Sequence, residues 1–237
     1  MADHHRVRVG DVSMAYRVSG DPDAPPLVLL HALGENATDW AGVAPAFTRH
    51  WRVYAPDLRG HGESDHPGDY SFDLMRDDVV GFLDALGLTR VDLIGHSMGG
   101  VVAYLLAGKH PERVGRLVLE DVPPPLPREP TLSTRPEGPL SFDWAAVAAV
   151  KAQVDVPDPA WLAGLGGIGA PTLVVAGGPQ SHVPQDRIAE MAHRIPDCRV
   201  VTIPAGHLVH AAMPAEFTET VLRFLRPADA RNQTHGR

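Results

Sequence analysis

Short apolar runs alternate along this chain with segments whose apolar residues recur at helical spacing. The runs are dominated by Leu, Ile, Val and Ala, and they lie at 27–30, 91–94, 117–119, 173–176 and 200–203. The run at 27–30 is continuous, which is typical of a strand that is buried on both faces of a parallel sheet. The alternation therefore predicts an α/β fold: a mostly parallel, twisted sheet of about eight strands with helices on both faces and right-handed crossovers.

Helix and hairpin signals fill the segments between these runs. Phe72–Leu86 places its apolar residues on one helical face, and Gly87 follows its end. A strand at 52–55 ends before Pro56, because proline lacks the N–H group. We expect strands at 7–12 and 14–19 to pair as a hairpin, and we predict further helices at 38–50, 97–109, 185–194 and 215–225.

The pattern changes between Val122 and Gly169. The stretch PPPLPREP at 123–130 can form neither a helix nor a central strand. The sequences SFDWAAVAAVKAQV and DPAWLAGL, which follow it, predict two helices. We interpret 122–169 as a small helical lid inserted into one core domain, formed by 1–121 and 170–226, with a flexible tail at 227–237. The apolar lid residues expected to roof a site are Leu126, Leu132, Leu140, Phe142, Trp144, Val147 and Trp161.

The composition excludes several classes of protein. The sum of Lys and Arg is 21 and that of Asp and Glu is 29, so a net charge of −8 argues against nucleic-acid binding. No stretch approaches the roughly 18 apolar residues of a membrane helix, and the first residues do not resemble a secretory signal. Cys198 is the single cysteine, which favours a reducing, cytoplasmic location. We therefore expect a small-molecule substrate, with no cofactor, metal, nucleic acid or membrane as partner.

Gly95-His96-Ser97-Met98-Gly99 lies between an expected strand and an expected helix. A G-x-S-x-G sequence at such a turn strains the serine backbone, and its glycines let neighbouring backbones approach closely. The serine hydroxyl then stands at the carboxyl edge of the sheet, where open α/β sheets bind ligands. In the simpler alternative Ser97 is only the helix N-cap. The context favours a nucleophile, which needs a base and donors for an oxyanion.

Four segments together resemble the α/β-hydrolase superfamily. They are HALG at 31–34, DLRGHGES at 57–64, GHSMGG at 95–100 and PAGHLVH at 204–210. The resemblance extends from about Val7 to Leu225 and implies the fold of that superfamily, with Ser97 as the nucleophile.

The resemblance also implies the groups that would act on Ser97. It places the general base at His207, in the loop after the last strand, with His210 as the weaker candidate. It assigns the oxyanion hole to the main-chain amides of Met98 and Leu33. The chain departs from the family at Ala32, where glycine is usual and a positive φ would be costly for alanine. Supporting rather than chemical roles are implied for His31, Asp57, Arg59, His61 and His96.

The acid of the triad is absent from its usual place. Many members of the family carry an aspartate after the strand that here reads PTLVVAGG, but 179–184 contain no acid, and Asp186 comes too late. Some members carry the acid one strand earlier, which here points to Asp121 and, as a second choice, to Glu120. Strand residues alternate between faces, so only one of the two is expected to face His207. A triad without a carboxylate, with Ser181 or a water beside His207, is the third alternative.

These features predict a serine hydrolase that cleaves a small, largely apolar carboxylic ester, lactone or thioester through an acyl-enzyme. Cofactor-free haloperoxidases, carbon–carbon bond hydrolases and hydroxynitrile lyases resemble the chain in the same segments and remain alternatives. Dehalogenases and epoxide hydrolases fit less well, because their nucleophile is an aspartate. A hydrolase-like binding protein is the alternative from a different class, since fold analogy alone does not decide function.

Overall fold

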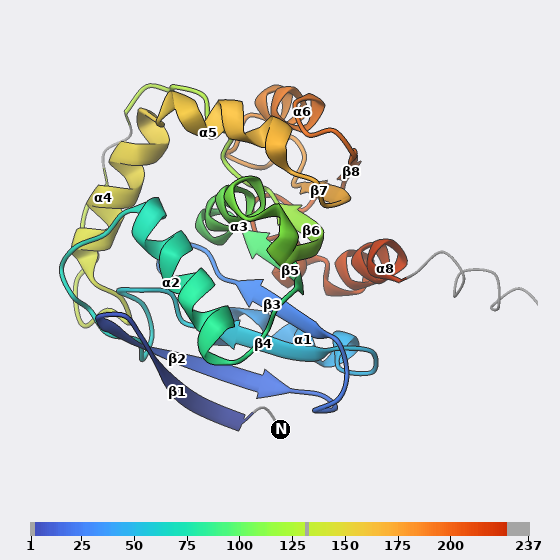
Figure 1. The fold of residues 1–237 in the computed structure, drawn as a ribbon. Coiled ribbons are helices and arrows are strands. Elements are labelled where there is room, and N and C mark those ends of the chain that lie inside the picture. The colour runs from blue at the N-terminus through green and yellow to red at the C-terminus, as the bar shows by residue number, and fades with distance from the viewer. Residues whose placement is uncertain (1–2, 131–132, 227–237) are drawn as a thin grey trace, which may run out of the picture.

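A single twisted sheet organises the computed structural model, which describes residues 3–130 and 133–226 (Figure 1). Within these ranges eight strands lie in the order β1-β2-β4-β3-β5-β6-β7-β8. They are β1 (Asp3–Val9), β2 (Val12–Ser19), β3 (Pro26–Leu30), β4 (Arg52–Pro56), β5 (Val91–His96), β6 (Val114–Glu120), β7 (Thr172–Ala176) and β8 (Cys198–Thr202). The β1–β2 and β2–β4 pairs are antiparallel and the others are parallel, which confirms the predicted mostly parallel sheet.

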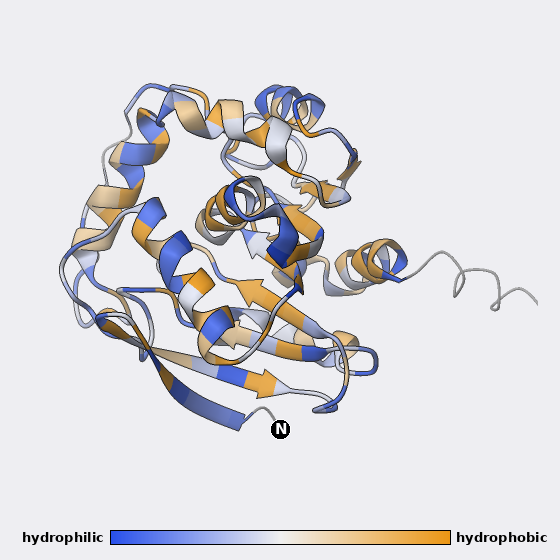
Figure 2. Ribbon diagram, in the orientation of Figure 1, coloured by the Kyte–Doolittle hydropathy of each residue, from blue (hydrophilic) through white to orange (hydrophobic). Residues whose placement is uncertain are grey.

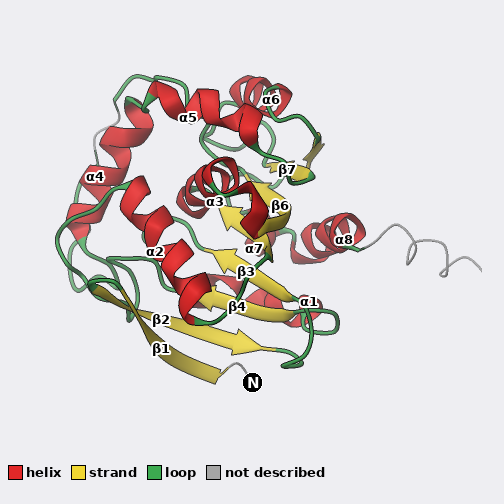
Figure 3. Cartoon of the chain, in the orientation of Figure 1, coloured by secondary structure: helices red, strands yellow, loops and turns green. Residues whose placement is uncertain are grey.

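Helices cover both faces of this sheet (Figure 3). The α-helices are α1 (Ala44–Phe47), α2 (Phe72–Ala85), α3 (Met98–Lys109), α4 (Trp144–Asp155), α5 (Pro159–Gly164), α6 (Gln185–His193), α7 (Val209–Ala212) and α8 (Pro214–Leu225). Three 3-10 turns are also described, η1 (Ala37–Gly42), η2 (Pro111–Arg113) and η3 (Leu165–Gly167). The apolar residues of α2, α3 and α6 join one core cluster, and those of η1, α1 and α8 join the other.

Strand β3 shows how the sequence builds two cores. Leu27 and Leu29 belong to one cluster, whereas Val28 and Leu30 belong to the other, because successive side chains point to opposite faces. All four side chains are buried, so the run is continuously apolar. Figure 2 shows β3 as mainly hydrophobic and the edge strand β1 as mainly hydrophilic. The charged and polar edge of β1 protects the sheet against pairing with another chain.

The helix predicted at 38–50 is instead two short pieces, η1 and α1. The side chain of Asn36 accepts a hydrogen bond from the Thr38 amide, and η1 starts at Ala37, one residue earlier than predicted. Gly42 ends it and Pro45 lacks the amide that a continuous helix needs there. The short helix α7 was not predicted. Leu132 and the predicted tail at 227–237 lie outside the described residues.

The segment between β6 and β7 contains the two predicted helices, α4 and α5. Asp143 caps α4 by accepting from the Ala145 amide at 3.0 Å, and it accepts a second bond from the Tyr70 hydroxyl at 2.6 Å. Trp161 of α5 packs edge-on against Phe72, with ring centroids 5.4 Å apart. These contacts attach the segment to α2 and to the residues just before it. The boundaries of a lid at 122–169 stay a prediction. Across the described ranges, no helix has both the length and the apolar character needed to cross a membrane.

Candidate active site

Ser97 lies in the turn between β5 and α3, at the carboxyl edge of the sheet. Its φ of 49° and ψ of −113° are strained for a residue with a side chain. The Ser97 amide donates to the Glu120 carbonyl at 3.0 Å, and the Ser97 carbonyl accepts from the Gly100 amide at 3.0 Å. The Ser97 side chain stands at the N-cap position but makes no capping hydrogen bond. The main chain is therefore fixed while the hydroxyl stays available.

The glycines beside Ser97 are required by close packing. A Cβ on Gly95 would lie 2.7 Å from the Gly100 amide nitrogen, and a Cβ on Gly99 would collide with the main-chain oxygens of Leu30 and His31. Helix α3 can approach β3 and β5 this closely only without those side chains. The G-x-S-x-G sequence thus produces the strand-to-helix turn that it predicts.

His207 lies in the loop between β8 and α7, with its ring against Asp121. The distance between His207 Nδ1 and Asp121 Oδ2 is 2.7 Å. Since a carboxylate only accepts, Nδ1 carries the hydrogen and Nε2 is left free to accept a proton. Asp121 is the first residue after β6, its φ is 42°, and its amide donates to the Val175 carbonyl at 2.8 Å. Among the alternatives for the acid, Asp121 is the carboxylate that contacts His207.

Asp121 is held by several donors besides His207. Its carboxylate accepts from the Gly177 amide at 2.8 Å, from the Gln185 side chain at 3.3 Å and from the Ser181 hydroxyl. Burial alone would raise the pKa of Asp121, but these hydrogen bonds and that of His207 outweigh burial and lower it. Ser181, considered above as a partner of His207, thus donates to the acid instead.

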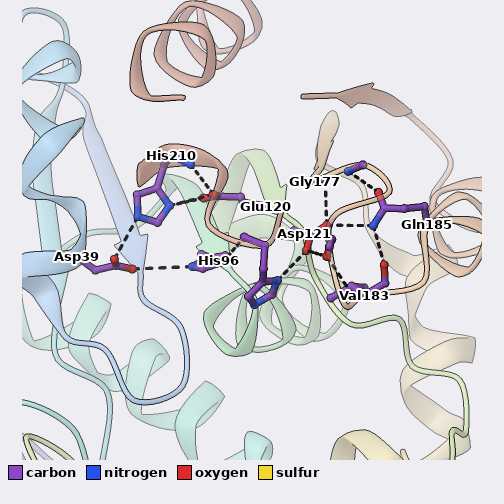
Figure 4. A network of polar contacts seen from close by, with 11 residues as sticks. Asp39, His96, Glu120, Asp121, Gly177, Val183, Gln185 and His210 are labelled. Carbon is purple, nitrogen blue, oxygen red and sulfur yellow. Dashed lines mark hydrogen bonds and ion pairs between the residues drawn. The ribbon is translucent and has the colours of Figure 1, made fainter. Parts of the chain in front are cut away.

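Glu120 belongs to a different buried cluster. It accepts from the His210 amide at 2.8 Å and from His210 Nδ1 at 2.9 Å, and Asp39 Oδ1 lies 3.2 Å from His210 Nε2 (Figure 4). Burial disfavours the charged imidazole, yet the two carboxylates outweigh burial and raise the pKa of His210 to about 10. Burial would raise the pKa of Asp39, but the neighbouring His210 and His96 side chains outweigh burial and lower it. His210 is therefore a buried cation between two anions. Because both carboxylates engage its ring, this weaker candidate is not free to act as the general base.

His96 connects this cluster to the loop of His207. Its Nε2 donates to the main-chain oxygen of His207 at 2.9 Å, and its Nδ1 lies 3.9 Å from Asp39 Oδ2. Figure 4 shows the continuous series of contacts from Glu120 through His210, Asp39 and His96. The supporting role that the resemblance implies for His96 thus has a defined contact: it fixes the backbone of the histidine beside Asp121.

The same cluster includes the described residues best suited to hold a metal ion. Asp39, His96 and His210 each present one ligand atom, and these atoms lie within 4.8 Å of one another. Carboxylate and imidazole are suitable ligands for a divalent cation. However, both ring nitrogens of His210 face carboxylates, which favours a proton on each, and a protonated imidazole cannot bind a metal. The cluster is held by the ion pairs of His210, although Asp39 Oδ2, His96 Nδ1 and His210 Nε2 make no hydrogen bond within the part of the chain that the structure describes.

A cavity of about 620 Å³ joins the residues singled out in the sequence. It is lined by Ser97, Met98, His207 and Leu33, by residues of the segment between β6 and β7 (Pro123, Arg128, Ser133, Val147, Val150, Lys151 and Val154), and by Ala32, Glu35, His182, Val183, Pro184 and Leu208. This volume is within the range of pockets that hold a small molecule. Of the apolar lid residues expected to form a roof, Val147 is in the cavity wall, whereas Trp161 packs in the core.

The loop after β3 is braced by His31. His31 Nε2 accepts from the Leu58 amide at 2.9 Å, and His31 Nδ1 donates to the Ala32 carbonyl at 2.8 Å. Burial lowers the pKa of His31 to about 4, consistent with a neutral ring that both donates and accepts. Ala32 does not have a positive φ, whereas Gly34 has a φ of 84°. The alanine that replaces the usual glycine therefore adds no backbone strain, and Leu33 keeps its place beside Ser97 in the cavity wall.

Sequence reasoning missed several residues of this site. Lys151, Val150 and Val154 belong to the cavity wall, and His182 lies over His207 with ring centroids 4.2 Å apart. A usable signal was the helical spacing of Val147, Val150, Lys151 and Val154. Their direction toward the cavity depends on how α4 packs on the core, which the sequence pattern does not fix.

Comparisons with known proteins agree with this geometry. A family model described as alpha/beta hydrolase fold matches residues 25–146. The sn-1-specific diacylglycerol lipase ABHD11 of Mus musculus is 29% identical over 262 residues, which cover 88% of this chain and 83% of that protein. The 2-hydroxymuconate semialdehyde hydrolase of Pseudomonas sp. (strain CF600) is 46% identical over 99 residues, covering 40% of this chain and 35% of that protein.

A solved structure gives the same result over nearly the full length. The crystal structure of a hydrolase from Pseudomonas aeruginosa PA01 superposes with a TM-score of 0.83 at 30% sequence identity. The match covers 95% of this chain and 99% of that one. The similarity thus includes the elements that carry Ser97, Asp121 and His207.

Proposed function

This chain belongs to the alpha/beta hydrolase fold family, and on that basis we propose that it is a serine hydrolase with Ser97, His207 and Asp121 as its triad. Its substrate would be a small, largely apolar carboxylic ester, lactone or thioester. The observation that carries the proposal is the contact of 2.7 Å between His207 Nδ1 and Asp121 Oδ2, made where His207 and Ser97 line one cavity. A buried carboxylate that orients a histidine beside a strained serine is the arrangement that acyl transfer needs.

The reaction would begin at the Ser97 hydroxyl. Its oxygen attacks the carbonyl carbon of the substrate while His207 Nε2 accepts the proton, and Asp121 stabilises the resulting imidazolium. The main-chain amides of Met98 and Leu33 would donate to the oxyanion, and the N-terminus of α3 adds a favourable field. The protonated His207 then gives its proton to the leaving alcohol or thiol, and an acyl-enzyme remains.

Water would complete the cycle. His207 Nε2 removes a proton from a water molecule, which attacks the acyl carbon; the Ser97 oxygen then leaves with that proton, and a carboxylic acid is released. The valines of α4 and Val183 give the cavity an apolar wall for the acyl or alcohol group.

The first test is hydrolysis of p-nitrophenyl acetate and butyrate by the wild type and by Ser97→Ala, Asp121→Asn and Glu120→Gln. We expect Ser97→Ala to fall to background and Asp121→Asn to lose about 10⁴-fold in kcat, as in other triads whose acid is made neutral. Glu120→Gln, which leaves the Asp121–His207 contact intact, should retain far more activity than Asp121→Asn. Equal rates for the wild type and Ser97→Ala would refute the proposal.

An independent readout is covalent trapping of the nucleophile. A fluorophosphonate should add to Ser97 of the wild type and leave Ser97→Ala unmodified, as intact mass and peptide mapping would show. Labelling at a different residue would refute the assignment even if esters were hydrolysed. Folding of each variant is checked by circular dichroism.

Carbon–carbon bond hydrolysis is the second candidate, favoured by the match to 2-hydroxymuconate semialdehyde hydrolase. It would use the same three residues. Turnover of 2-hydroxymuconate semialdehyde by the wild type, lost in Ser97→Ala and faster than that of the p-nitrophenyl esters, would select it over ester hydrolysis.

A further inference from the structure

One lysine stands in the stripe of α4 that faces the cavity. The stripe consists of Val147, Val150, Lys151 and Val154, which are spaced i, i+3, i+4 and i+7 and so share one face of the helix. The three valines are 6%, 3% and 8% exposed, and they present an apolar wall. Lys151 places an ammonium group at the edge of that wall, where a packing residue would be expected if the cavity served only apolar groups.

Within the part of the chain that the structure describes, no carboxylate pairs with the ammonium group of Lys151. Its Nζ donates to the Ser133 hydroxyl at 2.6 Å, which uses one of its three hydrogens. A cation beside an apolar surface is stabilised when an anion with matching hydrogen-bond acceptors is placed against it.

Two other charged side chains, Arg128 and Glu35, line the cavity, and neither is suited to bind an anion. Arg128 is paired within the lid, because its Nε lies 2.6 Å from Asp155 Oδ1. Glu35 lies on the loop after β3, at the wall that also carries Leu33. Burial, followed by the neighbouring Asp39, raises the pKa of Glu35. Glu35 repels an anion at its wall when it is ionised, and its raised pKa weakens that repulsion, whereas the ammonium group of Lys151 attracts an anion.

We propose that the substrate carries an anionic group, a carboxylate or a phosphate, remote from its scissile carbonyl, and that Lys151 binds it. This inference rests on the proposed function, since it orients the substrate with its carbonyl at Ser97 and its anionic end at the lid. The apolar part of the substrate would lie along the valines of α4. The substrate class is then an ω-carboxyacyl ester or an ester whose alcohol bears a phosphate, rather than a wholly apolar ester.

The test compares esters of equal length that differ only in terminal charge. Monomethyl adipate and monomethyl suberate are paired with methyl hexanoate and methyl octanoate, and acid release is followed in a pH-stat. We expect the wild type to prefer the charged member of a pair in kcat/KM. Lys151→Met should lower kcat/KM for that ester by roughly tenfold, the value of one charge-assisted hydrogen bond, and leave the uncharged ester within about twofold.

The chain offers a matched control. Lys109 is the only other lysine in the sequence; it lies exposed at the end of α3 and outside the cavity wall. Lys109→Met changes the net charge by the same amount, so it should keep the wild-type preference. Lys151→Glu should reverse the preference, because it places an anion where the substrate charge would lie.

A binding measurement separates this inference from the proposed function. Ser97→Ala should bind monomethyl suberate in isothermal titration calorimetry, and Ser97→Ala combined with Lys151→Met should bind it about tenfold more weakly. A second titration uses acyl glycerol 3-phosphate as the ligand. The ligand that loses more affinity when Lys151→Met is added, the carboxylate or the phosphate, is the one that Lys151 recognises.

The outcomes are distinct. A charge preference that survives Lys151→Met, the absence of any preference in the wild type, or binding that is unchanged or absent in both Ser97→Ala backgrounds would overturn the role of Lys151. Ester hydrolysis that does not depend on Ser97 would refute the proposed function instead, and the calorimetry would still decide whether Lys151 holds an anion.

Discussion

His96 Nε2 donates a hydrogen bond to the main-chain oxygen of His207 across 2.9 Å. The residue before the proposed nucleophile thereby holds the backbone of the proposed base. His207 is fixed at two points, since Asp121 accepts from its ring and His96 donates to its carbonyl. The ring can then keep its direction although the loop that carries it lies between β8 and the short helix α7.

Loss of the His96 contact should affect catalysis more than substrate binding. We expect His96→Phe to lower kcat by roughly tenfold with KM nearly unchanged, because a misplaced base slows proton transfer. His96→Gln retains an amide donor and should recover part of the loss. Steady-state kinetics with p-nitrophenyl butyrate measure both constants. A fall in thermal stability without a change in kcat would show that His96 only packs the core.

Ser181 should influence resistance to acid. Burial raises the pKa of Asp121, but its hydrogen bonds lower it by more. The pKa of Asp121 in the folded state therefore lies below its pKa in the unfolded state. Such a group stabilises the fold above its unfolded pKa, and this contribution is lost as the pH falls through the folded pKa. Ser181→Ala removes one donor, and we expect its acid unfolding midpoint to move to higher pH. Circular dichroism between pH 6 and pH 2 tests this, with Ser133→Ala as a control.

His210 should make the fold sensitive to alkali. Its pKa is raised to about 10, above the ordinary value of 6.5, because Asp39 and Glu120 outweigh burial. The sign is opposite to that of Asp121: the stabilisation is complete below pH 6.5 and is lost as the pH rises through about 10. We expect the free energy of unfolding to decrease from pH 7 to pH 10 by an amount on the order of a few kcal/mol. His210→Gln should be less stable at pH 7 and should show a flatter dependence.

The buried pair of Arg59 and Asp78 should be a strong determinant of stability. Arg59 Nε and Nη2 lie 2.7 and 2.9 Å from the two oxygens of Asp78, and the two residues are 3% and 5% exposed. Arg59→Met leaves Asp78 as an uncompensated buried charge and should cost about 3–5 kcal/mol. Asp78→Asn should cost less, because Arg59 Nη2 still lies 3.4 Å from Asp11 Oδ1. Urea unfolding measures this. Arg59→Met combined with Asp78→Leu should recover part of the loss; additive losses would show that the two charges act independently.

The sequence predicted an element correctly wherever the local residue pattern of that element reflects its burial in the fold. The apolar runs predicted the strands because parallel strands are buried on both faces, and Gly95 and Gly99 predicted the turn at Ser97 because α3 packs against β3 there. The helix at 38–50 was wrong, since Asn36 and Pro45 act locally in a way that apolar spacing does not report.

The acid illustrates what the sequence left open. Asp121 and Glu120 are adjacent and both buried, and only the three-dimensional arrangement shows which one contacts His207. The cluster of Asp39, Glu120 and His210 joins residues far apart in the chain, so no local pattern predicts it. The same is true of Lys151, whose position in the cavity wall depends on the packing of α4.

The position of Asp121 at the end of β6 has a consequence for how this protein could change over time. All three proposed triad residues follow β5, β6 or β8, so the connection from β7 to α6 carries no proposed triad residue. Together with Gln185 at the start of α6, it supplies supports for Asp121 from Gly177 and Ser181, and the cavity residues His182, Val183 and Pro184. Between those positions, mutation can change the shape of the cavity wall, and with it the range of accepted molecules, while Ser97, His207 and Asp121 stay the same.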